Sequence, residues 1–258
     1  MKIALVSFLN TMPFIDGLIR EFSKNEVELQ RVSPSACAKM LASRECSVAL
    51  VPIGALPGLQ GVNLMTDWCI GSNGHVDSVF LFSEKSVKKI EKIILDPDSR
   101  TSNLLVKILA KNYWRIEPEY ENGKVKDSSL VTGTTGMVGI GDWAYKHRLE
   151  FGRAYDLSVV WREMTGLPFV FAVWAYHPEL VSSEMLSRIR SGLESGVERR
   201  FEFAGNWATE FGYDKRDAVE YLGQTIQYKF DRDRHQAMDR FFREAKLAGL
   251  LPEIVEAE

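Results

Sequence analysis

Residues 27–53 read VELQRVSPSACAKMLASRECSVALVPI, and this stretch decides the fold class. The segments VELQRV and CSVALVPI are typical of strands, and SPSACAKMLASRE between them is typical of a helix. A strand, a helix and a strand in this order predict a parallel βαβ unit. The run VALV is continuous rather than alternating, which indicates a strand buried on both faces and helices on both sides of the sheet.

The same alternation continues on both sides of this stretch. Before it, KIALVS is a predicted strand and TMPFIDGLIREFSK a predicted helix. After it, the predicted strands are DSVFLFS, IILD, a Gly-rich strand in TTGMVGIGDWAYKH that ends at a helix start, and LPFVFAVWAY. NLLVKILAKNYW is a predicted helix, and the chain from Pro178 onward is predicted to be mostly helical. The sequence therefore predicts an α/β protein with a helical C-terminal segment.

Two α/β segments followed by a helical tail indicate two lobes that are joined by more than one crossing strand. The strands SVFLFS and PFVFAVW are the expected crossings. One lobe then comprises residues 1–83 plus 172–258, and the other comprises residues 84–171. A ligand would lie in the cleft between them, at the carboxyl ends of strands and the amino ends of helices.

Composition and charge exclude several classes of protein. The 258 residues are 45% hydrophobic, which is enough for a substantial core. The 32 basic and 35 acidic residues are interspersed, so no charged block indicates a nucleic acid or a membrane surface as partner. No apolar run approaches the roughly 20 residues that span a bilayer. The N-terminal segment turns polar at Ser7 and Asn10, too early for a signal peptide, so we expect a cytoplasmic protein.

Cysteine and histidine spacing gives no sign of a metal site. The cysteines are Cys37, Cys46 and Cys69, without a C-x-x-C pair, so neither a disulfide framework nor a zinc knuckle is expected. They are expected to be buried thiols, and Cys37 has no histidine nearby in sequence to activate it. The histidines are scattered without metal-binding spacing. We therefore do not expect a metal site.

The segment LDPDSRTSNLL at residues 95–105 has the composition of a strand-to-helix turn. Asp98 or Ser99 suits the N-cap position, and the free amides of the first helical turn favour an anion. Arg100 adds a fixed charge with a forked donor. Together with Thr101 and Ser102 it could form a cradle for a carboxylate. The alternative is an ordinary capped helix with Arg100 in solvent.

Other turns after the predicted strands are also small and polar. Each candidate in them has a structural alternative: Asn10 could cap a helix, Ser35 could be a plain N-cap, Gly141 could permit a tight turn, and Asp142 could be an N-cap rather than a base. The aromatic side chains Trp161, Phe169, Phe171 and Trp174 are expected mostly in the core, although one or two could pack on a flat ligand ring.

Taken together, these blocks resemble a known family. VSFLNTMPF, VPIG, SNGHVDSVFLFS, LDPDSRTSNLL, GIGDWA and above all YDLSVVWREMTGLPFVFAVW are similar to the chorismate dehydratases of the futalosine route to menaquinone. The resemblance covers residues 1–174. It implies the two-lobed fold of type 2 periplasmic-binding proteins and the loss of water from chorismate to give an enolpyruvyl-benzoate, 3-[(1-carboxyvinyl)oxy]benzoate, without a cofactor or metal.

The resemblance also implies roles for particular residues. Asn10 of the LN motif would be catalytic, orienting either the departing hydroxyl or the carboxyvinyl arm. In suitable loops, only His75 and Asp142 could titrate, so we expect a carboxylate of the substrate itself to take the ring proton. The expected substrate-binding residues are Ser7, Thr11, Ser35, Ser78, Arg100, Thr101, Ser102, Gly141, Asp142 and Phe169.

Three other functions remain open from the sequence. A non-catalytic protein that binds small anions would share the fold, but it would need export. The dihydroxynaphthoate synthase of the same pathway is similar in fold, but no histidine occupies a matching loop. A regulatory effector-binding domain would need a helix-turn-helix segment or a basic patch, which is not seen before the first strand. The expected partner is chorismate, with neither nucleic acid nor membrane, and the tail could form a homodimer surface.

Overall fold

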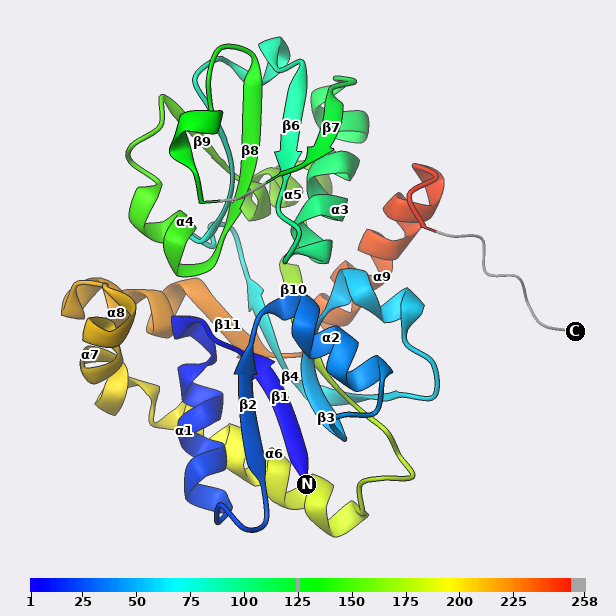
Figure 1. Cartoon of the computed structure of the whole chain (residues 1–258), viewed down its shortest axis with the longest axis vertical. Coiled ribbons are helices and arrows are strands. Elements are labelled where there is room, and N and C mark those ends of the chain that lie inside the picture. The colour runs from blue at the N-terminus through cyan, green and yellow to red at the C-terminus, as the bar shows by residue number, and fades with distance from the viewer. Residues whose placement is uncertain (124–125, 252–258) are drawn as a thin grey trace, which may run out of the picture.

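The computed structural model describes residues 1–123 and 126–251, which form two β-sheets with helices packed around them (Figure 1). The larger sheet has six strands in the order β11-β4-β10-β3-β1-β2, and the smaller sheet has five in the order β7-β6-β8-β5-β9. In Figure 1 the smaller sheet lies above the larger one, and the chain passes between them more than once. The predicted two-lobed α/β architecture is confirmed.

The larger sheet is built from both ends of the chain. Strands β1, β2 and β3 are parallel, as the βαβ pattern predicts, whereas β10 runs antiparallel to both β3 and β4, and β11 runs antiparallel to β4. Its strands and flanking helices are β1 (Lys2–Val6), η1 (Leu9–Thr11), α1 (Met12–Glu21), β2 (Glu28–Val32), α2 (Pro34–Ala42), β3 (Val48–Pro52), η2 (Ile53–Gly58), β4 (Asn63–Ser72), β10 (Phe169–Tyr176) and β11 (Ile226–Lys229).

The smaller sheet is formed by the middle of the chain. Its elements are β5 (Val79–Ser83), η3 (Val87–Lys89), β6 (Lys92–Leu95), α3 (Arg100–Leu109), η4 (Ala110–Trp114), β7 (Glu119–Asn122), η5 (Ser128–Leu130), β8 (Thr135–Ile140), α4 (Gly141–His147), β9 (Arg153–Asp156) and α5 (Leu157–Thr165). The predicted boundaries at residues 83 and 171 assign β5 to the first lobe and residues 169–171 to the second. In the structure β5 belongs to the smaller sheet, and residues 169–171 belong to the larger one. A strand that is buried throughout, such as β5, does not indicate in its sequence which sheet it joins.

The tail is mostly helical, as predicted, but it also contributes the edge strand β11. Its helices are α6 (Ser183–Glu198), α7 (Arg200–Phe211), α8 (Lys215–Glu220), the π-helical turn η6 (Tyr221–Thr225) and α9 (Arg232–Leu247). Helix α6 packs closely on α1, and α9 contacts α3 of the other lobe. Neither β4 nor β11 was predicted, β4 because its first half mixes polar and apolar residues without regular alternation, and β11 because it is four residues long and lies among helices.

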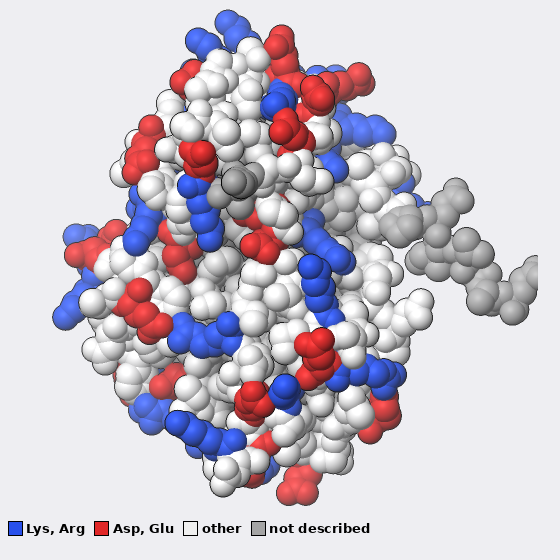
Figure 2. Space-filling model, viewed as in Figure 1, with Lys and Arg blue, Asp and Glu red and all other residues white. Residues whose placement is uncertain are grey.

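Two expectations about the surface and the thiols can be compared with the structure. Acidic and basic side chains are intermixed on the face that Figure 2 presents, as the interspersed sequence charges predict. All three cysteines are buried and free, and burial raises the pKa of the Cys37 thiol to about 12, which makes it a poor nucleophile. Among the described helices, none combines the length and the apolar character needed to cross a bilayer.

Candidate functional site

A pocket of about 570 Å³, partly open to solvent, lies between the two sheets. Its walls come from the ends of β1 and β3, from β10, from the segment leading into β5, and from the starts of α3 and α4. Among the described residues that line it, none carries a charge; the polar ones are Asn10, Thr11, Ser78, Ser99, Thr101 and Ser102. A ligand in this pocket therefore meets hydroxyls, one amide and the peptide backbone between apolar walls.

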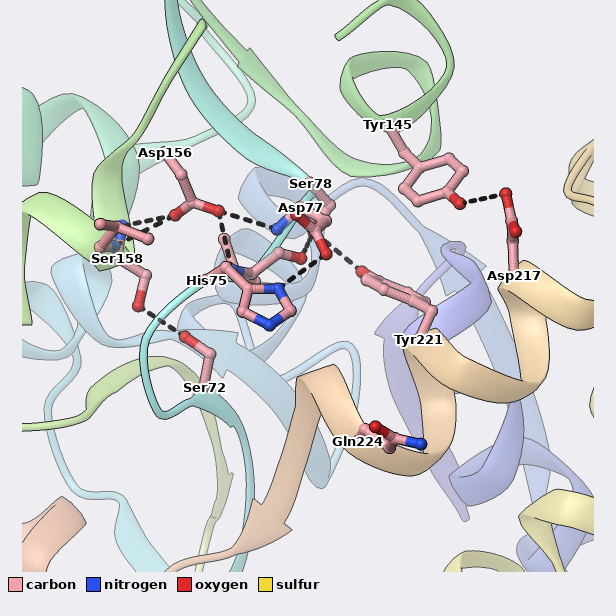
Figure 3. Close-up of polar contacts among 12 residues, drawn as sticks. Ser72, His75, Asp77, Ser78, Tyr145, Asp156, Ser158, Asp217, Tyr221 and Gln224 are labelled. Carbon is pink, nitrogen blue, oxygen red and sulfur yellow. Dashed lines mark hydrogen bonds and ion pairs between the residues drawn. The ribbon is translucent and has the colours of Figure 1, made fainter.

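Asn10 lines the pocket from the turn that follows β1. Its side-chain Nδ2 donates to the hydroxyl of Tyr221 at 3.3 Å, and its backbone carbonyl accepts from the Tyr228 hydroxyl at 3.0 Å. Tyr221 in turn donates to Ser78 Oγ at 2.8 Å, as Figure 3 shows. Asn10 is only 8% exposed. Its bonds to the two tail tyrosines, one of which is anchored on Ser78, therefore hold this amide in a fixed position.

The start of α3 forms the opposite wall of the pocket. Ser99 is the N-cap, one of the two residues expected there: its Oγ accepts from the Ser102 amide at 3.3 Å and donates to Ser102 Oγ at 2.8 Å. Thr101 Oγ1 accepts from Gly54 N at 3.0 Å and donates to the Phe171 carbonyl at 3.1 Å, which ties α3 to the other lobe. The positive end of the α3 dipole therefore lies beside the pocket.

Arg100 does not belong to this pocket. Its side chain is exposed and lines a separate depression with Gly54, Leu104 and Lys107. The reason is helical geometry: Thr101, Ser102 and Leu105 are on the buried face of α3, and Arg100 is on the outward face with residues 104 and 107. The predicted carboxylate cradle thus retains its hydroxyls and the helix start but loses its guanidinium.

Three further predicted residues also lie outside the pocket, and Asp142 is a fourth. Ser7 is exposed and lines a neighbouring hollow that contains Asp96 and Asp98. Ser35 donates to Asp98 Oδ1 at 2.7 Å across the lobes. Phe169 is in the aromatic core, edge-on to Trp161, and it is Phe171, two residues later, that lines the pocket.

Gly141 lines the pocket and must be glycine. Its φ is +65°, and a Cβ atom there would lie 2.6 Å from the Phe8 ring. Both the backbone conformation and the close approach of Phe8 therefore exclude a side chain. Gly141 thus has the backbone of a tight turn, as the structural alternative expects, and it lines the pocket; its contact with a substrate stays a prediction.

Asp142 contacts the opposite lobe but does not line the pocket. Its carboxylate accepts from the Leu9 amide at 3.3 Å and from the Tyr213 hydroxyl at 3.0 Å. Burial raises the pKa of this carboxyl to about 6. Asp142 lies inside the first turn of α4, so it is not the N-cap that the sequence suggested.

Further hydrogen bonds join the lobes around the pocket. Ser72 and Ser158 hydroxyls are 2.6 Å apart, and Tyr145 donates to Asp217 at 2.8 Å, both visible in Figure 3. With the Thr101 and Ser35 contacts, these bonds surround the pocket on several sides. The structure therefore has its lobes closed on one another.

Comparison with known proteins identifies the family. A sequence profile described as menaquinone biosynthesis matches residues 1–247. The chain belongs to the menaquinone biosynthesis family. The chorismate dehydratase of Thermus thermophilus is 31% identical over 220 residues, which cover 78% of this chain and 80% of that protein. The chorismate dehydratase of Campylobacter jejuni is 27% identical over 229 residues, 88% of this chain and 87% of that one.

A solved structure supports the fold of this family member. A Candida albicans gene product with the generic periplasmic-binding-protein fold superposes with a TM-score of 0.69 at 13% identity, covering 98% of this chain and 91% of that chain. At this level of identity the likeness shows the fold alone. The predicted periplasmic-binding-protein-like fold is confirmed.

Two tyrosines of this family member were missed by sequence reasoning. Tyr221 and Tyr213 both contact predicted site residues, yet they lie in the tail, more than 200 residues from Asn10. Nothing local distinguishes them from core tyrosines, because their role depends on which segment the tail meets. In the described part of the chain, no group of three or more His, Cys, Asp or Glu side chains is arranged to hold a metal ion.

Proposed function

We propose that this protein dehydrates chorismate to 3-[(1-carboxyvinyl)oxy]benzoate, the first step of the futalosine route to menaquinone. The observation that carries the proposal is the chemistry of the pocket: Asn10 and the start of α3 both line it, and none of its described lining residues is charged. Relatives named chorismate dehydratase, similar over most of the chain, support it.

The two carboxylates of chorismate need donors, and the pocket offers neutral ones. The first turn of α3 brings the positive end of a helix dipole, a setting that binds carboxylates without a basic side chain. Within the described residues no acceptor takes the hydroxyl hydrogen of Ser102, so this hydroxyl can donate to a substrate oxygen. Thr101 acts indirectly in this proposal, because both of its described bonds go to the opposite lobe.

The reaction breaks one C–H bond and one C–O bond on neighbouring ring carbons. The electron pair of the C–H bond forms the last double bond of the aromatic ring, and the hydroxyl leaves as water. Because no titratable side chain among the described residues lines the pocket, the side-chain carboxylate of the substrate takes the ring proton and passes it to the departing hydroxyl, which Asn10 orients. The protein contributes position and a preorganised polar environment, and aromatisation provides the driving force.

The test is turnover by the purified protein after treatment with a chelator. Chorismate is added, and the product is identified by its aromatic absorbance and its mass, which is one water lower than that of the substrate. We expect conversion by the native protein and a loss of about 10- to 100-fold in kcat for Asn10→Ala, since it removes a positioning contact. Asn206→Ala, on the exposed surface of α7, is the matched control and should retain full activity.

Two outcomes would reject the proposal in favour of the alternatives. Unchanged chorismate together with conversion of a cyclic futalosine derivative would indicate the dihydroxynaphthoate synthase. Binding of small anions without turnover of either compound would indicate a binding protein. A cytoplasmic location and a homodimer remain predictions from the sequence.

A further inference from the structure

Tyr221 lies between Asn10 and Ser78, two polar residues that line the pocket. It is 2% exposed, it begins the π-helical turn η6, and its ring packs beside those of Tyr145 and Tyr213. Its hydroxyl contacts Asn10 Nδ2 at 3.3 Å and Ser78 Oγ at 2.8 Å. Three segments that are far apart in the sequence therefore meet at one phenol oxygen, and Figure 3 shows its contact with Ser78. π-Helical turns are frequent at functional sites.

Asn10, Tyr221 and Ser78 form a series of hydrogen bonds, and the final bond of the series fixes the direction of the others. Ser78 Oγ donates to the backbone carbonyl of Val76 at 3.3 Å, and a carbonyl can only accept. The Ser78 hydroxyl hydrogen is thereby used, so Ser78 must accept the hydrogen of Tyr221. The phenol oxygen of Tyr221 is then left as an acceptor, and only the NH₂ end of the Asn10 amide can donate to it.

This direction determines which end of the Asn10 amide is left for a ligand. A flipped amide would bring Oδ1 against the phenol oxygen with no hydrogen between them, which is costly at a buried site. In the described part of the chain no donor reaches Asn10 Oδ1, and Asn10 lines the pocket. The oxygen is therefore the end that can accept from a hydroxyl group of the substrate.

We propose that Tyr221 is a positioning residue: its phenol, anchored through Ser78 on the Val76 carbonyl, holds Asn10 with Oδ1 available to the hydroxyl that leaves. The role in turnover rests on the proposed function, whereas the orientation of the amide does not. Tyr221 acts through Asn10 and needs no contact with the substrate.

Tyr221→Phe removes only the hydroxyl and keeps the buried ring. We expect kcat to fall about tenfold or more with KM changed less than about threefold, because orientation of the reacting group is lost while the rest of the pocket remains. In an Asn10→Ala background, Tyr221→Phe should change kcat by less than about twofold, since a residue that acts through Asn10 has nothing left to position.

Tyr145→Phe is the matched control. It also removes a tyrosine hydroxyl that bonds across the lobes, to Asp217, in the same aromatic cluster, but Tyr145 makes no hydrogen bond to Asn10 or Ser78 among the described residues. Both variants should lose a similar amount of thermal stability, and only Tyr221→Phe should lose turnover. Equal losses of kcat in the two variants, or the same loss from Tyr221→Phe with and without Asn10, would overturn the proposal.

A readout without substrate separates this proposal from the proposed function. In the ¹⁵N-labelled, ligand-free protein, the Asn10 Nδ2 proton that is bonded to Tyr221 should exchange slowly with water. In Tyr221→Phe it should exchange quickly. Identical Asn10 side-chain signals in the two proteins would overturn the positioning role, even if the native protein fails to dehydrate chorismate.

Discussion

The carboxyl group of Asp142, which lies at the contact between the lobes, makes the stability of the protein depend on pH. It lies on α4, bonds to Leu9 and Tyr213 of the other lobe, and has a pKa raised to about 6 by burial. The folded state therefore binds the Asp142 proton more tightly than the unfolded chain does. Protonation of Asp142 therefore increases the free energy of unfolding as pH falls through about 6. This contribution is lost as pH rises through about 6.

Asp142→Asn removes the titration while keeping a similar shape. We expect the stability of the native protein relative to this variant to increase by about 1 to 2 kcal/mol between pH 8 and pH 5, from a shift of about two pKa units. Urea unfolding of both proteins at the two pH values measures it. Asp96, whose pKa burial also raises to about 6, titrates in both proteins and cancels in the difference. A difference that does not vary with pH would contradict this account of Asp142.

Individual site residues could be predicted from sequence only where a local motif carried them. Asn10 and Ser78 lie in short turns whose position after or before a strand is fixed locally, and both line the pocket. Arg100 was misplaced because adjacent helical residues point about 100° apart, so the first buried residue decides the face. Tyr221 was missed because its contact depends on the docking of the tail.

At the scale of secondary-structure elements, the segment between β4 and β5 is held by the start of α5. Asp156 Oδ2 accepts from the Val76 and Asp77 amides at 2.8 and 2.9 Å, while Oδ1 caps α5 through the Ser158 amide (Figure 3). Asp77 has a left-handed backbone with φ 57°, a conformation that costs free energy outside glycine. The bonds to Asp156 therefore stabilise the segment that delivers Ser78 to the pocket.

Loss of the Asp156 carboxylate should cost more than loss of an ordinary cap. We expect Asp156→Ala to lower the free energy of unfolding by about 3 kcal/mol, because buried amides lose their acceptor as well as the helix cap. Asp214→Ala is the control, since Asp214 caps α8 at an exposed position, and about 1 kcal/mol is expected there. Chemical denaturation of both variants measures the two losses of unfolding free energy. Equal losses would mean that Asp156 is only a cap.

Helices α1 and α6 approach each other more closely than side chains allow. A Cβ atom on Gly196 would lie 1.9 Å from the Pro13 carbonyl oxygen, and one on Gly17 would lie 1.9 Å from the Gly192 carbonyl oxygen. These contacts are with backbone, which cannot move aside without separating the helices. Glycine is therefore required at this crossing despite its low helix propensity.

Alanine at this crossing should be destabilising, in contrast to its usual effect in a helix. Gly196→Ala is expected to lose about 2 kcal/mol or more of stability through overpacking. Gly205→Ala on α7, where the added Cβ would meet only the Lys215 side chain at 3.8 Å, should gain up to about 1 kcal/mol from helix propensity. Thermal unfolding compares the two, and a stabilised Gly196→Ala protein would show that the helices can separate without cost.

At the scale of the whole molecule, the sequence predicted the lobes better than their exact boundaries. The N-terminal βαβ pattern and the buried strands β3 and β10 required a layered α/β protein. The sheet to which β5 belongs, and the insertion of β4 and β11 beside β10, depend on contacts between distant segments. We propose that the lobes divide between β4 and β5 and again at the start of β10.

Closure of the lobes makes a pocket whose polar groups come from both sides. Asn10 belongs to the larger sheet's lobe, the α3 hydroxyls belong to the other, and Tyr221 and Thr101 tie the lobes together. No single lobe contains the site. The central claim is that this closed, uncharged pocket positions chorismate while the substrate itself supplies the base.

The most direct test compares chorismate with an analogue whose side-chain carboxylate is replaced by a primary carboxamide. The amide keeps the shape and one acceptor oxygen but is a very weak base. At saturating concentration we expect the analogue to bind as a competitive inhibitor and to lose water about 10²- to 10⁴-fold more slowly than chorismate, the usual contribution of general base catalysis. Loss of water from the amide at a rate within about tenfold of that of chorismate would contradict the account, because the base would then belong to the protein.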